Sequence, residues 1–289
     1  MSIMTARNLE AAIALQNSVD YGLTAGIHSL NSQEINDWLS RVQAGNVYVN
    51  RGITGAIVQR QPFGGWKRSA VGPGAKAGGP NYLFGLTDWQ SESNNAVESI
   101  DSAVINELLV MAAQSVLSDS EMESLIRSAQ SDLAALKHYF SGSKDATGLS
   151  AELNYLRYFR SDCMLRLNEK ATEYEIWRAL VTAAAVGSVE VSAAGLPVRL
   201  SRMLTRTGLK LRVESEEQWL AGLKGPRRVR VLGLKQWHER LSDPDIAIYE
   251  GDVTESGIIE LLPYFKEQAV SVTAHRFGNP ARHVKSLQL

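Results

Sequence analysis

The glycine-rich stretch from Gly45 to Leu83 holds the residues whose types and spacing offer most to a ligand. It carries nine of the 23 glycines and three of the eight prolines, which disfavour a continuous helix. It also carries large apolar side chains, including Tyr48, Phe63 and Trp66, which a flexible linker lacks. We therefore expect an ordered loop that offers backbone N–H groups to a ligand.

The sequence gives little support for a phosphate loop, a cysteine nucleophile or a metal site. The stretch has neither G-x-x-x-x-G-K-[ST] nor a strand–GxGxxG–helix unit, so it is not a phosphate loop, and Lys76 beside Gly78-Gly79 is unspecific. The single cysteine, Cys163, lies in a predicted strand, where a lone cysteine is most often an inert apolar residue, although Arg160 nearby could lower its pKa. The five histidines show no metal-ligand spacing.

The elements that position the loop precede it. Capping residues and apolar spacing predict helices from Asn8 to about Val19 and from Asn31 or Ser32 to Val42, and strands at 23–28 and 47–50. Strand–helix–strand with short connections is a parallel βαβ unit. Open α/β sheets bind ligands beyond the carboxyl ends of their strands, and the stretch leaves such an end directly after Asn50.

The pattern after the loop predicts a strand from Tyr82 to Gln90 and then two helices, 103–117 and 121–140, the second with a capping box from Ser120 to Glu123. From Ala151 onward strands and helices alternate, which is typical of a Rossmann-like α/β domain. The strands expected there lie around 153–155, 165–167, 189–191, 209–213, 228–232, 245–249 and 270–274, and the helices at 172–187, 215–223 and 257–268.

Composition limits the function classes. Lys plus Arg number 30 against 31 for Asp plus Glu, which lacks the basic footprint of a nucleic-acid binder. One cysteine and no signal peptide favour a cytoplasmic location. No apolar run approaches the ~20 residues that span a membrane. In the strand 228–232, alternation predicts that Arg228 and Arg230 share a solvated face.

Five motifs stand in order along the first third of the chain. They are Tyr21-Gly22-Leu23-Thr24-Ala25-Gly26, Gly45-Asn46-x-Tyr48-x-Asn50-Arg51, Thr54-Gly55-Ala56, Gln61-Pro62-Phe63-Gly64-Gly65 and Lys76-Ala77-Gly78-Gly79-Pro80-x-Tyr82-Leu83. These motifs resemble the aldehyde dehydrogenase superfamily, and within it the L-glutamate γ-semialdehyde (1-pyrroline-5-carboxylate) dehydrogenases. The remainder of the chain resembles the C-terminal region of long bifunctional proline-utilisation flavoproteins.

The resemblance implies a role for three residues of the loop. The N–H groups of Gly55 and Ala56 would bind the α-carboxylate of the substrate, and Phe63 would pack on its aliphatic stem. A turn of small residues lets N–H groups converge on an anion, and such bonds are charge-assisted. Composition alone favours an ordinary turn at 54–56, whereas the resemblance favours a carboxylate anchor.

The resemblance also implies a domain order within an α/β fold. Residues 1–98 would be the end of an aldehyde dehydrogenase catalytic domain with the anchor loop and an oligomerisation strand. Residues 99–148 would be a helical linker, and residues 149–289 a Rossmann-like C-terminal domain that acts as a lid.

Family catalysis requires a nucleophilic cysteine, a glutamate base, an oxyanion-hole asparagine and an NAD-binding domain, which would all precede this chain. We therefore expect no catalytic, cofactor-binding or metal-binding residue here and no dehydrogenase activity for the chain alone. The expected partners are glutamate semialdehyde or glutamate in the complete site, and either an N-terminal catalytic half or a second copy. The alternatives are a non-enzymatic assembly module and a truncated relic.

Overall fold

The computed structural model describes residues 3–90, 98–196, 200, 201, 204, 209–225, 227–241 and 243–288. It forms two compact units, each built from separate segments of the chain. The first unit comprises Met1–Leu86, Gly142–Phe159 and Glu267–Leu289, and the second comprises Thr87–Ser141 and Arg160–Lys266. The predicted order of three consecutive domains stays a prediction.

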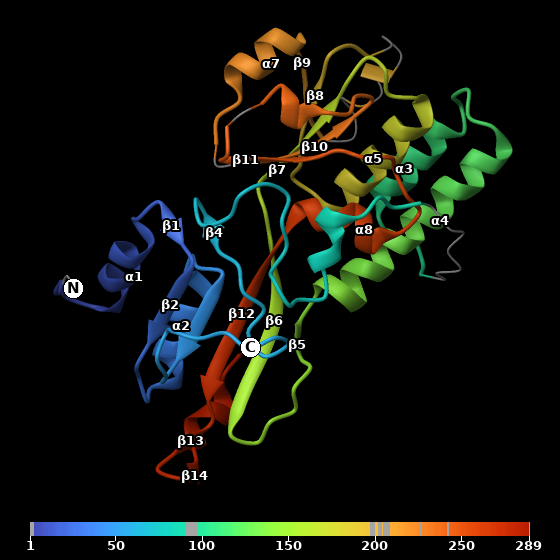
Figure 1. The fold of residues 1–289 in the computed structure, drawn as a ribbon. Coiled ribbons are helices and arrows are strands. Elements are labelled where there is room, and N and C mark those ends of the chain that lie inside the picture. The colour runs from blue at the N-terminus through green and yellow to red at the C-terminus, as the bar shows by residue number, and fades with distance from the viewer. Residues whose placement is uncertain are drawn as a thin grey trace. The chain divides into compact units, whose positions relative to one another are not determined.

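The first unit is built on a five-stranded sheet (Figure 1). Strand β3 lies between β2 and β12 and runs parallel to both, whereas β5 is antiparallel to β6. In spatial order the strands are β2 (Thr24–Ile27), β3 (Asn46–Val49), β12 (Phe265–Thr273), β6 (Glu152–Arg160) and β5 (Ser143–Asp145).

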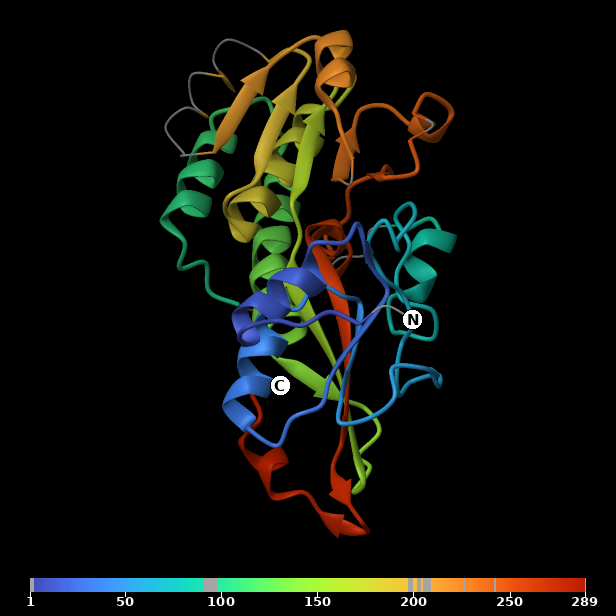
Figure 2. The same cartoon turned by 90° about the vertical axis from the view of Figure 1, so that its left-hand side faces the viewer.

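Helices α1 (Leu9–Asn17) and α2 (Ser32–Arg41) begin at the predicted caps, because the side chains of Asn8 and Asn31 accept backbone N–H bonds there. The predicted βαβ unit is confirmed as β2–α2–β3 with parallel strands. Figure 2 shows the two helices next to one another. Their apolar faces share one core with β3 and β12, formed by residues such as Ile13, Trp38 and Val49.

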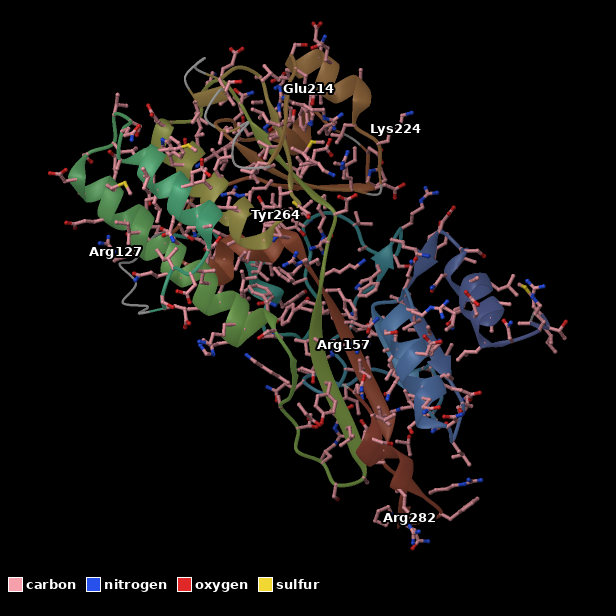
Figure 3. All side chains as sticks on the ribbon, turned by 180° about the vertical axis from the view of Figure 1, so that it is seen from behind. Arg127, Arg157, Glu214, Lys224, Tyr264 and Arg282 are labelled. Carbon is pink, nitrogen blue, oxygen red and sulfur yellow. The ribbon has the colours of Figure 1, made fainter. Side chains whose placement is uncertain are left out.

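A set of polar contacts joins two strands of this sheet to α2. Arg157, labelled on β6 in Figure 3, donates to Gln268 Oε1 on β12 at 3.0 and 2.6 Å and to the Leu39 carbonyl at 2.6 Å. Burial lowers the pKa of Arg157 to about 10. Gln268 in turn donates to the Ala44 carbonyl at 2.8 Å, so the last long strand is fixed to the residues just before β3.

One short element of the first unit differs from the sequence prediction. The segment expected as a strand from Tyr82 to Gln90 begins with a 3-10 helix, Tyr82–Leu86. Local i→i+3 bonds, such as the Phe84 N–H to the Asn81 carbonyl at 3.0 Å, replace strand pairing. The others are β1 (Tyr21–Gly22) paired with β4 (Trp66–Lys67), β13 (His275–Arg276) paired with β14 (Asn279–Pro280), and a 3-10 helix at Arg282–Ser286.

The second unit contains a five-stranded sheet in which every neighbouring pair is parallel. This confirms the α/β, Rossmann-like fold class. In spatial order the strands are β11 (Ile246–Tyr249), β10 (Arg227–Leu232), β7 (Cys163–Leu167), β8 (Glu190–Ala193) and β9 (Lys210–Val213). The helices expected over 172–187 and 215–223 are confirmed as α5 (Glu173–Val186) and α7 (Glu216–Gly222), each of which begins with a capping box, from Thr172 and Ser215.

Further helical segments of this unit include α3 (Ala103–Ala112), α4 (Asp119–Ala135), which continues as a π-helix over Leu136–Phe140, and a 3-10 turn at Trp237–Glu239. The capping box predicted from Ser120 is wrong by two residues. Ser118 caps α4, with Glu121 as its reciprocal partner. The S-x-x-E pattern fits both registers, and the observed one places Asp119 and Glu121 in the first turn, where the helix dipole favours acids.

The helix expected over 257–268 is also wrong in its second half. Helix α8 spans Gly257–Leu261, a 3-10 turn follows at Leu262–Tyr264, and the chain then becomes β12. Pro263 lacks an N–H and cannot continue an α-helix. None of the described helices is long and apolar enough to cross a membrane.

Candidate functional site

The candidate loop begins where β3 ends, at Asn50, whose φ of 57° turns the chain. Gly55 has a φ of 87°, in the left-handed region that favours glycine, and beyond its two chain neighbours no described residue has an atom within 4 Å of the position that a Cβ would occupy. Gly55 and Ala56 are exposed, and Phe63 is 37% exposed. The loop therefore presents its small-residue turn to the outside.

Tyr48 holds one end of this turn. Its ring is fully buried on β3, and its hydroxyl donates to the Gly55 carbonyl at 3.1 Å. Burial raises the pKa of the Tyr48 hydroxyl, and the positive charge of Arg51 opposes the rise. The hydroxyl is therefore protonated near neutral pH and acts as a donor.

Gln61 holds the other end. Its Oε1 accepts the Ile57 N–H at 3.0 Å, directly after Ala56. Its Nε2 lies within hydrogen-bond distance of three acceptors on β6 and β12: Glu152 Oε1 at 2.9 Å, Asn154 Oδ1 at 2.9 Å and Ser271 Oγ at 2.8 Å. Gln61 is buried, so this side chain ties the loop to the sheet from the inside.

The charge of Arg51, which directly follows Asn50, is paired. Arg51 Nη1 lies 2.8 Å from Glu152 Oε2, and the Arg51 guanidinium lies 5.7 Å from the centre of the Tyr48 ring. In contrast, within the described ranges no acceptor takes a hydrogen bond from the N–H of Gly55 or Ala56. These two neutral donors are open to a ligand.

Phe63 lies at the far end of the same loop. Its N–H and carbonyl exchange hydrogen bonds of 2.9 Å with Ala77, which fixes its backbone, while its ring stays partly exposed. The structure thus places Gly55, Ala56 and Phe63 on one ordered loop. Their joint role in one binding site stays a prediction.

The side chain of Lys76 links this far end of the loop to Asn46. Its Nζ donates to Asn46 Oδ1 at 2.9 Å and also to the Gly64 carbonyl. Burial lowers the pKa of Lys76 to about 7, and Glu267 opposes the fall. Glu267 also accepts the Lys76 backbone N–H at 2.9 Å and the Asn81 amide at 2.8 Å.

The contacts of Tyr48, Gln61 and Lys76 were missed by sequence reasoning. All three lie inside the motifs that resemble the family, but no spacing rule shows what they touch. Gln61 meets residues 91 to 210 positions away in the chain. The one local signal was that Gln61, a polar residue, is followed directly by a proline and a phenylalanine.

The other sequence candidates fall outside this site. Cys163 is buried, and burial raises the pKa of its thiol to about 12 although Arg228 opposes the rise, so it is not a ready nucleophile. Trp66 and Trp219 are core residues, whereas Trp89 is 40% exposed. Among the described residues no cluster of three or more His, Cys, Asp or Glu side chains could hold a metal ion.

The solvated arginine face predicted on β10 is wrong. Arg230 is buried and reaches Glu260 at 3.3 Å and the Gly251 carbonyl at 2.9 Å. Arg228 is partly buried and donates to the Pro263 and Phe265 carbonyls. The alternation of β10 was read correctly, but a neighbouring segment with acceptors covers the arginine face.

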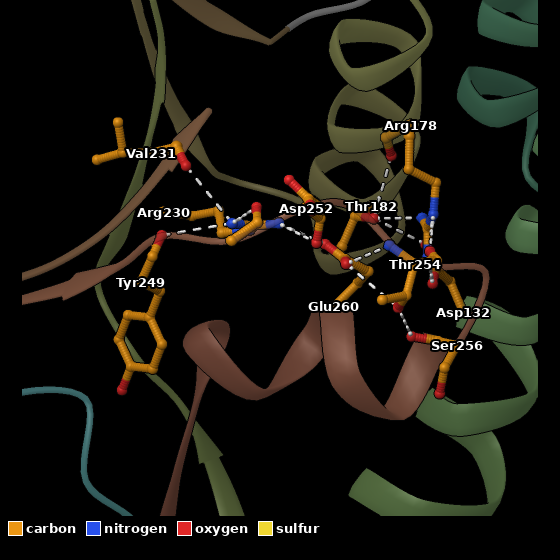
Figure 4. A network of polar contacts seen from close by, with 11 residues as sticks. Asp132, Arg178, Thr182, Arg230, Val231, Tyr249, Asp252, Thr254, Ser256 and Glu260 are labelled. Carbon is orange, nitrogen blue, oxygen red and sulfur yellow. Dashed lines mark hydrogen bonds and ion pairs between the residues drawn. The ribbon is translucent and has the colours of Figure 1, made fainter. Parts of the chain in front are cut away.

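Arg230 belongs to a buried network of the second unit, drawn in Figure 4. Its strongest pair joins Arg178 and Asp132 through two bonds of 2.7 and 2.8 Å, and both side chains are fully buried. Arg178 Nε also donates to the Thr254 carbonyl at 2.8 Å. We name the residues Asp132, Arg178, Thr182, Arg230, Thr254 and Glu260 the buried charge network.

The loop, the βαβ unit and the motifs define a class of protein. Residues 1–91 match the model of the aldehyde dehydrogenase family, which confirms the predicted resemblance for that part of the chain. Two of the matching proteins carry more specific names. The bifunctional protein PutA of Rhizobium meliloti is 34% identical over 215 residues, 71% of this chain and 16% of that protein. The 1-pyrroline-5-carboxylate dehydrogenase of Bacillus thuringiensis is 46% identical over 78 residues, 27% of this chain and 15% of that protein.

The fold has a counterpart among solved structures. Proline utilization A (PutA) from Corynebacterium freiburgense superposes with a TM-score of 0.71 at 35% identity, over 95% of this chain and 25% of that chain. The likeness therefore includes both units. The chain spans about a sixth of the length of the two curated relatives.

Proposed function

We propose that this chain is the C-terminal part of an NAD-dependent L-glutamate γ-semialdehyde dehydrogenase of the bifunctional proline-utilisation type. The observation that carries the proposal is the exposed Gly55–Ala56 turn, whose N–H groups are open within a segment that matches the aldehyde dehydrogenase family. The names of the relatives favour glutamate semialdehyde as the substrate of the whole enzyme.

The role of this chain in the reaction is to bind and orient. The substrate's α-carboxylate accepts the N–H groups of Gly55 and Ala56, and the Phe63 ring packs on the carbon chain. Hydrogen bonds to a charged group each contribute roughly 1.5–3 kcal/mol. Because the α-carboxylate is not the reacting group, these bonds fix where the distant aldehyde lies.

NAD would accept hydride in the complete enzyme, and we expect no site for it among the residues described. Strand β7 is followed by Asn168-Glu169-Lys170 and β10 by Gly233-Leu234-Lys235, and neither is a dinucleotide fingerprint. The buried Cys163 does not supply a nucleophile. We expect the isolated chain to show no NAD-dependent turnover of glutamate semialdehyde above a buffer blank, and turnover would contradict this assignment.

Glutamate binding tests the anchor directly. Calorimetric titration of L-glutamate should detect binding to the wild-type chain and at least a tenfold loss in Gly55→Pro, because proline removes one N–H and cannot adopt the φ of 87°. Gly72→Pro is the matched control, since Gly72 has a φ of 65° in the same stretch but lies outside the turn. Equal affinity of wild type and Gly55→Pro would overturn the anchor.

A second candidate function is assembly without catalysis. Several large apolar side chains of the first unit are exposed, and they include Ile53, Ile57, Val58, Val71, Leu83 and Leu86. Such side chains favour association with another polypeptide, either an N-terminal catalytic half or a second copy. A monodisperse monomer in light scattering, with no change on adding the catalytic half, would count against this function.

A further inference from the structure

We propose that Tyr48 and Gln61 are positioning residues of the carboxylate anchor, which aim the Ala56 N–H outward before any ligand arrives. The inference rests on the proposed function, because it concerns how the same turn is prepared for a carboxylate. It is carried by the contacts at the two peptide groups on either side of Ala56.

The first peptide group joins Gly55 to Ala56. Its carbonyl is that of Gly55 and its N–H is that of Ala56, and in a planar trans peptide these two point in opposite directions. The buried Tyr48 hydroxyl draws the Gly55 carbonyl toward β3 with a bond of 3.1 Å. The Ala56 N–H therefore points away from Tyr48. A donor at the carbonyl end also polarises the peptide and makes its N–H a stronger donor.

The second peptide group joins Ala56 to Ile57. Its N–H is accepted by Gln61 Oε1 at 3.0 Å, and the Gln61 N–H returns to the Ile57 carbonyl at 2.9 Å. This closes a small turn after the anchor. With both flanking peptide planes held, the backbone angles of Ala56 are fixed. Gln61 also keeps the Ile57 N–H from competing for the ligand.

The residues that hold the turn are themselves held. Tyr48 is fully buried in the sheet, and Gln61 is anchored by acceptors on β6 and β12 at 2.8 to 2.9 Å. Fixing a residue's backbone costs conformational entropy. In this chain that cost is met during folding, so a carboxylate meets donors already in place.

The first arm of the test needs no ligand. NMR relaxation should show a lower order parameter for the Ala56 amide in Tyr48→Phe and in Gln61→Leu than in wild type. Amide exchange at Ile57 should rise about 5- to 10-fold in Gln61→Leu, as expected for the loss of one hydrogen bond. Tyr158→Phe is the matched control, because the Tyr158 hydroxyl accepts the Asn81 amide at 2.9 Å in the same unit, away from the turn.

The second arm measures L-glutamate affinity by calorimetry. We expect about 5- to 10-fold weaker binding in Tyr48→Phe and Gln61→Leu, and unchanged binding in Tyr158→Phe. A merely structural role would weaken binding in all three variants in proportion to their loss of unfolding midpoint. The Tyr48→Phe variant removes one oxygen atom only, so it should fold even if Gln61→Leu does not.

The outcomes separate the two proposals. Unchanged order at Ala56 and unchanged exchange at Ile57 would overturn the positioning role. Changed order with no glutamate binding by wild type would support the positioning of the turn and overturn the carboxylate anchor. Changed order together with weaker glutamate binding in both variants supports both.

Discussion

The candidate loop of the first unit and the buried charge network of the second unit differ in how completely their polar groups are hydrogen-bonded. In the network, Arg178 meets Asp132 through two bonds, and Arg230 meets Glu260. Beneath the loop, Gln61 is satisfied equally well, but the N–H groups of Gly55 and Ala56 are left open at the exposed turn. The ion pairs of the network are closed to other partners, whereas the loop leaves two exposed N–H groups available to a ligand.

Arg166 is an intermediate case, because only some of its nitrogen atoms have hydrogen-bond partners. Arg166 on β7 is fully buried and bonds to Ser192 Oγ at 2.6 Å and to the Glu214 carbonyl at 3.3 Å, with Glu214 labelled in Figure 3. Its guanidinium lies 4.9 Å from the centre of the Trp219 ring. Within the described residues it forms no ion pair, and its Nε and Nη2 are buried without a hydrogen-bond partner. Arg166 is therefore a buried charge whose hydrogen bonds are only partly formed.

The largest effect should come from breaking the buried charge network. Arg178→Met leaves the carboxylate of Asp132 buried and unpaired, which typically costs about 3–5 kcal/mol. We expect that loss in the free energy of unfolding, measured by urea denaturation. The double variant Asp132→Leu with Arg178→Met removes both charges and should recover most of it. A loss below about 1 kcal/mol in the single variant would show that the network is not saturated.

The next effect concerns Lys76, a buried charge of the loop region that bonds only to neutral oxygens. Its folded pKa of about 7 lies below the ordinary value of 10.5, so the unfolded chain binds the proton more tightly. The lysine therefore destabilises the fold below pH 7, and the free energy of unfolding rises with pH between 7 and 10.5. From pH 7 to 9.5 the rise should be about 3 kcal/mol.

Urea denaturation at several pH values checks this rise. Lys76→Met should lose it, because methionine does not titrate. Lys67→Met is the control, since Lys67 Nζ donates to the Asn17 and Val19 carbonyls nearer the surface. The same pH slope in wild type and Lys76→Met would contradict the role of Lys76.

A smaller effect of opposite sign is expected at Arg166. The substitution used for Arg178, applied as Arg166→Met, removes a buried charge that forms no ion pair with any residue the structure describes. Replacing such charges by apolar side chains of similar size often stabilises a protein, here by about 1–2 kcal/mol. A rise in the unfolding midpoint would set Arg166 apart from Arg178, and a fall as large as that of Arg178→Met would make the two sites equivalent.

The smallest effect is expected at the N-cap of α4. Ser118→Ala should lower the free energy of unfolding by about 1 kcal/mol, because it removes the cap of α4. Ser120→Ala, on the other register of the same motif, should change it by less than about 0.5 kcal/mol. Thermal unfolding of the two variants side by side decides between the registers.

Local patterns predicted the parts of the fold that local forces determine. The caps at Asn8, Asn31, Thr172 and Ser215 and the parallel βαβ unit follow from residue types within a few positions. The motif resemblance pointed to Gly55, Ala56 and Phe63 on one loop, and their shared role is still a prediction.

Long-range contacts were beyond the reach of such patterns. The cover over Arg230 comes from Glu260, 30 residues away, and the support of Gln61 comes from strands 91 or more residues away. The two wrong elements, at 82–90 and 257–268, are both short apolar segments. Their conformation depends on the neighbours they pack against, which periodicity does not reveal.

Strand β12 has a consequence for how the polypeptide is made. Gln268 donates to the Ala44 carbonyl across 224 residues of chain, and β12 is the central strand of its sheet. During synthesis on the ribosome, the edge of β3 that pairs with β12 would stay unpaired until residues 265–273 have emerged. A chaperone that shields this edge, or a stop codon shortly before residue 265, would therefore affect the anchor loop far more than its distance in sequence suggests.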